Sequence, residues 1–240
     1  MRIKNRQEKI LETCSPTLKL KNFLSEPELI HLLNIHKDRP DSEKVFKVTG
    51  PIASKLPHKS DKHYQNILSR VEEVLKRKVK PFGGNYFTVK KPHILHNDVP
   101  KDHATIPGKC IVLPLEKVYT KYQLPMLDDA KFYIFDQMYF DRPVKCFKNK
   151  EAAKMYAKGN EPIFTYEDVY NLHEDNRVPD VSTGHMKDEW LEGFSVEAEC
   201  NWVPGDAIIF DCARLHCASN FLENGMEEKT GLSIFTEFVS

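Results

Sequence analysis

Two histidines and an aspartate are the residues in this sequence best suited to hold a metal ion. His96 and Asp98 form a His-x-Asp pair just after a strand-like segment and a break at Lys91-Pro92. In an extended segment, side chains two residues apart share a face with Cα atoms about 6.6 Å apart, so both can ligate one ion. The other two His-x-Asp pairs, His36–Asp38 and His173–Asp175, lie at a helix end and in a polar stretch. We interpret those two as solvated surface.

His216 is the best candidate for a third ligand, which an ion held by one imidazole and one carboxylate still needs. It follows a Pro204-Gly205-Asp206 turn and the apolar segment Ala207–Phe210, near the start of the next expected strand. A single histidine in such a place is more often a satisfied core residue. With His96 and Asp98, however, it completes the two-histidine, one-carboxylate set that leaves open positions on non-haem Fe(II).

The segments that must position these ligands are short, β-branched or aromatic, and bounded by Gly, Pro, Asp or Asn, which is typical of strands. Few helical segments separate them, so we expect an antiparallel sandwich or barrel. The expected strands are Asn85–Lys90, Cys110–Leu115, Lys131–Phe135, Phe194–Ala198, Ala207–Phe210 and Gly231–Phe238.

Helices are expected before this β region. Ser25-Glu-Pro-Glu28 has the form of a capping box, and the apolar stripe behind it predicts a helix that stops near Lys37. Apolar residues at three- and four-residue intervals predict a second helix over about Ser60–Lys78, ended by Pro81 and Gly83-Gly84.

We therefore predict a mainly β, α+β protein forming a single domain over residues 1–240. Residues 1–82 would be a helical N-terminal support and 83–240 the β core, with an insertion at about 141–195. Within the insertion, Lys150–Lys158 and Thr165–His173 favour short helices. An insertion of this length is either a lid or binding loop or a surface elaboration, and the sequence leaves both open.

Charge and composition exclude several classes of function. The 35 Lys and Arg balance the 35 Asp and Glu, so no overall field attracts nucleic acid. The lysine-rich stretches 76–80 and 145–150 have acidic neighbours, and an interaction module built on them is the least favoured interpretation. No apolar run reaches the length of a membrane helix, and the charged start is unlike a secretion signal, so we expect a cytoplasmic protein.

The six cysteines include no C-x-x-C pair, which favours free thiols in a reducing compartment. Cys212 and Cys217 bracket His216 and raise a zinc site as an alternative. They lack the paired spacing of structural zinc modules, so small buried thiols are the favoured interpretation.

The sequence resembles the Fe(II)- and 2-oxoglutarate-dependent oxygenases, in particular the hydroxylases similar to phytanoyl-CoA dioxygenase. The resemblance rests on His96-Asn-Asp98, on the Pro-Gly-Asp turn and strand before His216, and on a basic residue opening the strand after it. It extends over roughly 83–238 and implies a jelly roll, or double-stranded β-helix, of the cupin-like kind. It also implies Fe(II) on His96, Asp98 and His216, with 2-oxoglutarate and O₂ as cosubstrates.

A basic residue is also expected on electrostatic grounds. Fe(II), one aspartate and the dianion 2-oxoglutarate leave one negative charge uncompensated, and a buried carboxylate without a partner is costly. Lys229 stands thirteen residues beyond His216, and alternation places it with Ser233 on the face that would look into the barrel. Lys229 departs from the commoner arginine of the family, and Lys109 and Arg214 remain alternatives. Tyr86 is a further candidate to donate a hydroxyl to the same carboxylate.

The resemblance implies hydroxylation of a substrate C–H bond, with release of succinate and CO₂. We expect a small-molecule or peptide substrate, whose identity the sequence does not specify. The alternative is a cupin-like barrel that binds a metal or small ligand without oxidising anything, since such barrels share the Pro-Gly-Asp turn and a histidine-lined interior. Only the aspartate at 98 and the basic residue argue for the oxygenase.

Overall fold

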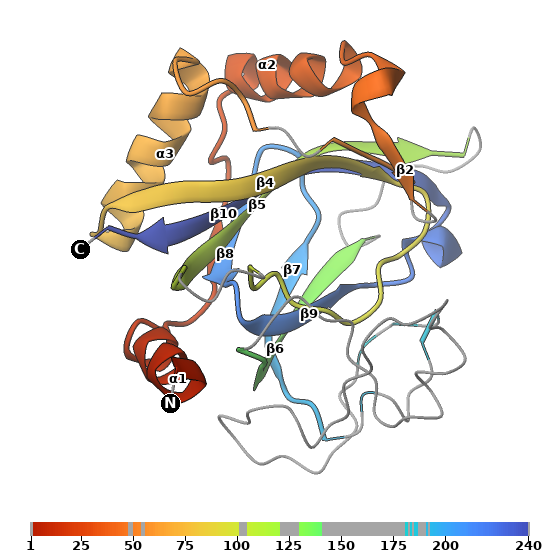
Figure 1. The fold of residues 1–240 in the computed structure, drawn as a ribbon. Coiled ribbons are helices and arrows are strands. Elements are labelled where there is room, and N and C mark those ends of the chain that lie inside the picture. The colour runs from red at the N-terminus through yellow and green to blue at the C-terminus, as the bar shows by residue number, and fades with distance from the viewer. Residues whose placement is uncertain are drawn as a thin grey trace.

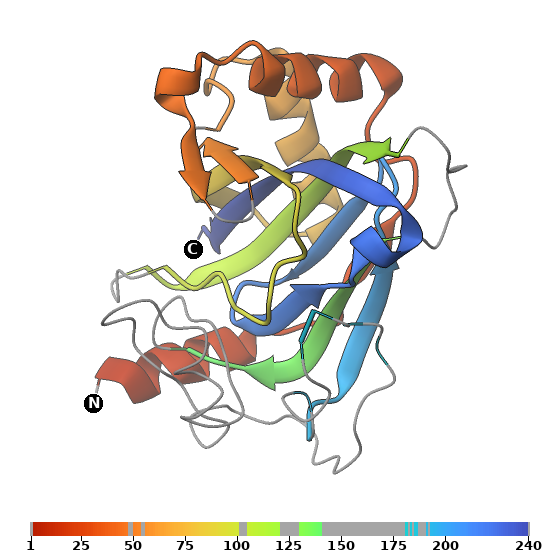
Figure 2. The same ribbon diagram turned by 90° about the vertical axis from the view of Figure 1, so that its right-hand side faces the viewer.

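Two antiparallel β-sheets pack face to face, with two helices covering the outer face of the larger sheet (Figures 1 and 2). The computed structural model describes residues 2–47, 50–53, 56–100, 105–120, 130–140, 181, 183, 185–186, 191 and 193–239. The sequence-based expectation of a mainly β protein with antiparallel strands is confirmed. The two short helices predicted at 150–158 and 165–173 lie outside the described residues.

The larger sheet has the strand order β1-β8-β5-β10-β4-β3-β2, and every pairing in it is antiparallel. The C-terminal strand β10 lies in the middle, between β5 and β4. In chain order its strands are β1 (Leu18–Leu20), β2 (Val45–Lys47), β3 (Gly50–Ala53), β4 (Val79–Val89), β5 (Pro107–Tyr119), β8 (Ala207–Asp211) and β10 (Met226–Phe238).

The smaller sheet has the order β7-β6-β9 and is also antiparallel. Its strands are β6 (Lys131–Met138), β7 (Val196–Asn201) and β9 (Arg214–Ala218). A buried cluster fills the space between the sheets, with Phe132 and Ala198 from the smaller sheet and Val112 and Phe210 from the larger. We call it the inter-sheet core; burying these large apolar side chains is the main source of stability for such a sandwich.

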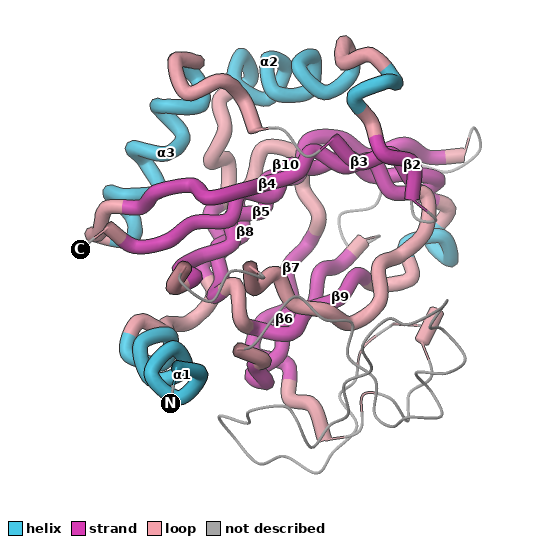
Figure 3. The backbone as a smooth tube through the Cα atoms, in the orientation of Figure 1, coloured by secondary structure: helices cyan, strands magenta, loops and turns pink. Residues whose placement is uncertain are grey.

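Three α-helices are described, α1 (Arg2–Glu12), α2 (Glu26–Lys37) and α3 (Lys62–Leu75), with short 3₁₀ turns at Asp41–Glu43 and Phe221–Asn224. Helices α2 and α3 lie on the outer face of the larger sheet, whereas α1 lies apart from them, close to the smaller sheet (Figure 3). The expected capping box is present: the Ser25 amide and hydroxyl both donate to the Glu28 carboxylate, at 2.9 Å each.

The second helix and the strand after it differ from the prediction. Helix α3 ends at Leu75, where Lys76 takes a left-handed conformation, and Pro81, Gly83 and Gly84 lie inside β4 rather than before it. Pairing with β10 explains the difference, because β10 forms partners with β4 from Val79 to Val89 and so extends β4 through the proline and the glycines. Pro81, which has no N–H to donate, is placed beside the irregularity between Phe235 and Thr236.

The first 82 residues also contain more than the expected helices. Helix α1 and strands β1, β2 and β3 were not predicted, and these strands extend both edges of the larger sheet. Strands of three or four residues have too little alternation to reveal themselves in sequence. Among the described helices, none combines the length and the apolar character needed to cross a bilayer.

Gly231 is required by the packing of the inter-sheet core. A Cβ atom there would lie 2.7 Å from Trp202 Cζ2 and 2.8 Å from Phe87 Cζ, closer than van der Waals contact permits. We expect Gly231→Ala to lower the free energy of unfolding by about 1–3 kcal/mol, the usual cost of overpacking. Chemical denaturation followed by tryptophan fluorescence measures this. Gly83→Ala is the matched control, since its Cβ would have Phe235 at 3.7 Å as nearest neighbour. Equal midpoints for the two variants would contradict the expectation.

Candidate metal centre

A backbone bridge joins the two segments that carry the candidate ligands. The His96 N–H donates to the His216 carbonyl at 3.0 Å, and the His216 N–H donates to the His96 carbonyl at 2.8 Å. The Asp98 N–H donates to the Cys212 carbonyl at 3.1 Å. The segment with His96 and Asp98 therefore lies antiparallel to β9, although it does not form a regular strand.

This bridge brings the three candidate side chains together as the sequence predicted. Potential ligand atoms of His96, Asp98 and His216 all lie within 4.8 Å of one another, and this is the one such group of three or more within the described residues. His216 Nε2 lies 3.3 Å from Asp98 Oδ2, and the two imidazole rings are 4.2 Å apart between centroids. One ion can contact all three, and a set of only three protein ligands leaves other coordination positions open.

Backbone carbonyls orient both imidazoles. His96 Nδ1 lies 2.8 Å from the Ile94 carbonyl oxygen, and His216 Nδ1 lies 3.0 Å from the Arg214 carbonyl oxygen. Donation from Nδ1 places the lone pair on Nε2, the nitrogen that would then ligate the ion. Metal-binding histidines usually have this second contact, which fixes the tautomer and the ring orientation. The donor set and its supporting contacts therefore fit a divalent transition-metal ion.

Apolar and thiol groups enclose the buried side of the site. His216 is only 2% exposed and packs against Phe132 and Phe210, with ring centroids at 5.2 and 4.8 Å. The Cys110 thiol donates to Asp98 Oδ2 at 3.6 Å, and burial, as the largest cause, raises the pKa of that thiol well above its usual value. The thiol stays protonated and is a donor to the carboxylate rather than a competing ligand.

The cysteines beside His216 do not join the site. Neither Cys212 nor Cys217 belongs to the group of potential ligand atoms found within the described residues, and burial raises the pKa of both thiols. Cys217 alternates with His216 on β9 and packs in a separate cluster with Tyr133 and Leu215. The five described cysteines are all free, in agreement with the expected reduced thiols.

Two further histidines lie next to the site and were not singled out as ligands from the sequence. His93 Nδ1 is 3.0 Å from His96 Nδ1, and their rings are tilted by 57° with centroids 4.0 Å apart. His185 Nε2 lies 3.3 Å from the His93 carbonyl oxygen, and burial lowers the pKa of His185. In the sequence, His93 and His96 are three residues apart, and this spacing was the signal that could have revealed His93. Residues three apart in an extended segment point to opposite faces, so the spacing did not suggest a shared site.

Lys229 is a buried cation with an unusual environment. Its side chain is 3% exposed and its Nζ lies 4.3 Å from the Trp202 ring and 5.2 Å from the Phe221 ring. No carboxylate in the described part of the chain pairs with it. Burial, as the largest cause, lowers the pKa of Lys229 to about 7. Both rings belong to the inter-sheet core, into which His216 also points.

The two alternatives to Lys229 are both already paired. Lys109 donates to Asp211 and, at 2.7 Å, to the Ser15 hydroxyl. Arg214 Nη1 lies 3.3 Å from Asp136 Oδ1, and its Nε lies 3.5 Å from Asp211 Oδ2. Among the three basic candidates, Lys229 alone is without a carboxylate partner in the part of the chain that the structure describes.

The structure does not bring Tyr86 and Lys229 together. Tyr86 pairs with Leu232 across β4 and β10 and belongs to the cluster beneath α2 and α3, where it stacks on His36 at 5.4 Å. Strand alternation puts Lys229 on the opposite face. Ser233 is half-buried and lies on the same face of β10 as Lys229, so its expected role stays a prediction.

Comparison with known proteins supports the fold independently. No protein-family model and no curated sequence matches the chain. Its structure is similar to SnoK, a non-haem α-ketoglutarate-dependent carbocyclase from nogalamycin biosynthesis, with a TM-score of 0.51, 11% identity and coverage of 95% of this chain and 81% of that one. The chain has the fold of the 2-oxoglutarate-dependent oxygenases.

Other solved structures agree with this assignment of the fold. SnoN, an α-ketoglutarate-dependent epimerase of the same biosynthesis, gives a TM-score of 0.51 at 10% identity, with 98% of this chain and 83% of that chain covered. EctD from S. alaskensis gives 0.50 at 11% identity, with 98% and 77% covered. The resemblance inferred from the motifs is thus confirmed at the level of the fold.

The geometry predicts the consequence of removing a ligand. We expect wild-type protein to bind one Mn(II) ion, and His96→Ala, Asp98→Ala and His216→Ala each to weaken binding by at least about a hundredfold. Anaerobic titration followed by electron paramagnetic resonance measures the affinity. His58→Ala is the matched control, because His58 is exposed and its ring contacts Ser60 rather than the candidate site. Retained affinity in the three ligand variants would contradict the site.

Proposed function

We propose that this protein is an Fe(II)- and 2-oxoglutarate-dependent oxygenase that hydroxylates a C–H bond of a small-molecule or peptide substrate. The observation that carries the proposal is the pairing of two features within one core. The first is the group of two histidines and one carboxylate, His96, Asp98 and His216. The second is Lys229, which is buried in the inter-sheet core without a carboxylate partner in the described part of the chain. The similarity of the fold to α-ketoglutarate-dependent enzymes supports the same conclusion.

In this proposal His96, Asp98 and His216 would hold Fe(II), and a set of three protein ligands would leave room for the cosubstrate. The bound iron and cosubstrates supply the oxidising power, with succinate and CO₂ as coproducts. Asp98 contributes one negative charge as well as a ligand atom. The Phe132 and Phe210 rings beside His216 exclude water from the buried side, which strengthens the electrostatic interactions there.

Lys229 would bind the distal carboxylate of 2-oxoglutarate. Its charge compensates the one negative charge left by Fe(II), Asp98 and the dianion. Trp202 and Phe221 surround the ammonium group with ring faces, which attract a cation but cannot neutralise it. A carboxylate entering this place replaces lost hydration with an ion pair, and this makes the site selective for a dicarboxylate over a monocarboxylate.

The second candidate function remains a non-oxidative, cupin-like barrel that binds a metal or small ligand. The same histidines and aspartate suit it, so the buried lysine is the feature that distinguishes the two. If the protein is the oxygenase, 2-oxoglutarate with anaerobic Fe(II) raises its melting temperature, and Lys229→Ala abolishes this shift. A shift with metal alone, unchanged by 2-oxoglutarate, would favour the cupin-like barrel.

The catalytic proposal is tested by turnover. Protein supplied with Fe(II), 2-oxoglutarate and O₂ is expected to release succinate, even slowly without its substrate, and His96→Ala and Asp98→Ala are expected to release none above background. Succinate is measured by mass spectrometry, with His58→Ala as the control that keeps wild-type release. Equal slow release from the wild type and both ligand variants would defeat the assignment of iron.

The state of Lys229 predicts a pH dependence of cosubstrate binding. With its pKa near 7 in the free protein, Lys229 is increasingly neutral above pH 7, whereas a bound carboxylate favours the charged form. Binding therefore takes up a proton, and affinity for 2-oxoglutarate falls as pH rises, by at most about tenfold per unit. Calorimetric titration of the Mn(II) protein between pH 7 and 9 measures the effect.

Lys229→Arg is the matched variant for this experiment, because a guanidinium stays charged over the whole range. Proton effects at the metal ligands are common to both proteins and cancel in the comparison. We expect a flatter affinity profile for Lys229→Arg than for the wild type. Parallel profiles would show that Lys229 does not titrate on binding.

A further inference from the structure

The β8–β9 turn, residues 211–214, accepts hydrogen bonds through its backbone from both segments that carry the candidate metal ligands, residues 96–98 and His216. The Cys212 carbonyl accepts from the Asp98 N–H at 3.1 Å. The Arg214 carbonyl accepts from His216 Nδ1 at 3.0 Å. A displacement of this turn would therefore move an aspartate and a histidine of the candidate metal centre together.

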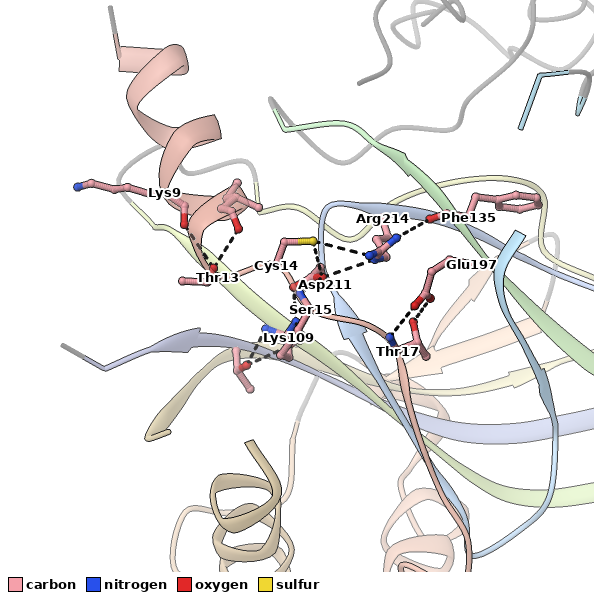
Figure 4. A network of polar contacts seen from close by, with 12 residues as sticks. Lys9, Thr13, Cys14, Ser15, Thr17, Lys109, Phe135, Glu197, Asp211 and Arg214 are labelled. Atoms are coloured by element: carbon pink, nitrogen blue, oxygen red, sulfur yellow. Dashed lines mark hydrogen bonds and ion pairs between the residues drawn. The ribbon is translucent and has the colours of Figure 1, made fainter. Parts of the chain in front are cut away.

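Buried charges hold the two ends of this turn. Asp211 is 2% exposed and accepts from Lys109, while Arg214 Nε lies 3.5 Å from Asp211 Oδ2. On its other side Arg214 contacts Asp136 and donates to the Phe135 carbonyl, both at 3.3 Å. Two cations, Lys109 and Arg214, thus balance Asp211 and the partly buried Asp136. Figure 4 shows Lys109, Asp211 and Arg214 of this group. Separating a buried ion pair leaves an uncompensated charge in the interior, which is strongly destabilising. Each charged side chain therefore holds its partner in position.

The segment after α1 completes this ion cluster. The Ser15 N–H donates to Asp211 Oδ2 at 3.2 Å and the Cys14 thiol donates to the same oxygen at 3.3 Å. The Ser15 hydroxyl accepts from Lys109 at 2.7 Å. Figure 4 shows this segment lying against Asp211 and Arg214 from the side of α1. Residues near the N-terminus therefore supply contacts that the strands do not provide.

Helix α1 also shares a buried cluster with residues next to both segments that carry the candidate metal ligands. Ile10 is 2% exposed and lies in one cluster with Val99, which follows Asp98, and with Ala213 of the β8–β9 turn. Arg6 Nη2 donates to the Pro100 carbonyl at 3.2 Å. One helix thus contacts the chain immediately after His96-Asn-Asp98 and the chain immediately before His216.

We propose that α1 and residues 14–15 are a positioning element of the metal centre, with Asp211 as its central positioning residue. None of these side chains is a ligand. They act through the backbone of the β8–β9 turn and of the segment after Asp98, and so set the separation of the three ligands. The inference rests on the proposed metal centre, and it adds that metal affinity depends on an N-terminal helix outside both sheets.

Asp211→Asn tests this proposal, with Mn(II) affinity and the visible absorption spectrum of the Co(II)-loaded protein as readouts. We expect about tenfold or greater loss of Mn(II) affinity, as supporting residues of metal sites usually show, and altered Co(II) bands at saturating metal. Glu28→Gln is the matched control. Glu28 is also a buried carboxylate, paired with Arg70 at 2.9 Å by two contacts, but it lies in the α2–α3 layer. It should leave affinity and spectrum unchanged.

A second pair of variants keeps the proposal falsifiable if Asp211→Asn fails to fold. Ile10→Ala truncates the α1 side chain in the cluster that contains Val99 and Ala213, and Ile67→Ala makes the same truncation in α3, where Ile67 is fully buried. Only Ile10→Ala should weaken Mn(II) binding. Wild-type affinity in Asp211→Asn and Ile10→Ala, or equal losses in the controls, would overturn the positioning role. Absence of Mn(II) binding by the wild type would instead overturn the metal centre itself, and this inference with it.

Discussion

The two backbone hydrogen bonds between His96 and His216 are the constraint on which the metal centre depends. They join an irregular segment to β9, and with the Asp98 contact to the β8–β9 turn they set the spacing of three side chains that are distant in sequence. Because backbone groups make these bonds, the main chain itself joins the two segments. The backbone carbonyls that accept from each imidazole Nδ1 also fix the orientation of the two rings.

Buried charges fall into two kinds in this structure. Lys109, Asp211, Arg214 and Asp136 compensate one another and hold a turn in place. Lys229 has only ring faces and a depressed pKa, which means that folding without a ligand leaves an electrostatic cost in the inter-sheet core. A structural lysine gains little from such an environment, whereas a lysine that awaits an anion gains a strong and specific partner.

The sequence pointed to the three candidate ligands because their signal is local. His96 and Asp98 have the alternation of an extended segment, and a Pro-Gly-Asp turn with an apolar strand precedes His216. The choice among Lys229, Lys109 and Arg214 depended instead on partners such as Asp211, which no local pattern connects to Lys109. Tyr86 was misplaced for a similar reason, because the face of a residue on a fully paired strand depends on register with its neighbours. Helix α1 was missed because its sequence is mostly charged and its role comes from a few tertiary contacts.

The central position of β10 has a consequence for the biosynthesis of this protein. Residues 226–238 form the strand that joins β5 to β4, so before they emerge from the ribosome the larger sheet exists as two unconnected halves. Contacts between such distant parts of a chain close slowly, since the loop entropy is spent before the contacts form. We therefore expect nascent chains to lack a fully packed interior until this strand is inserted.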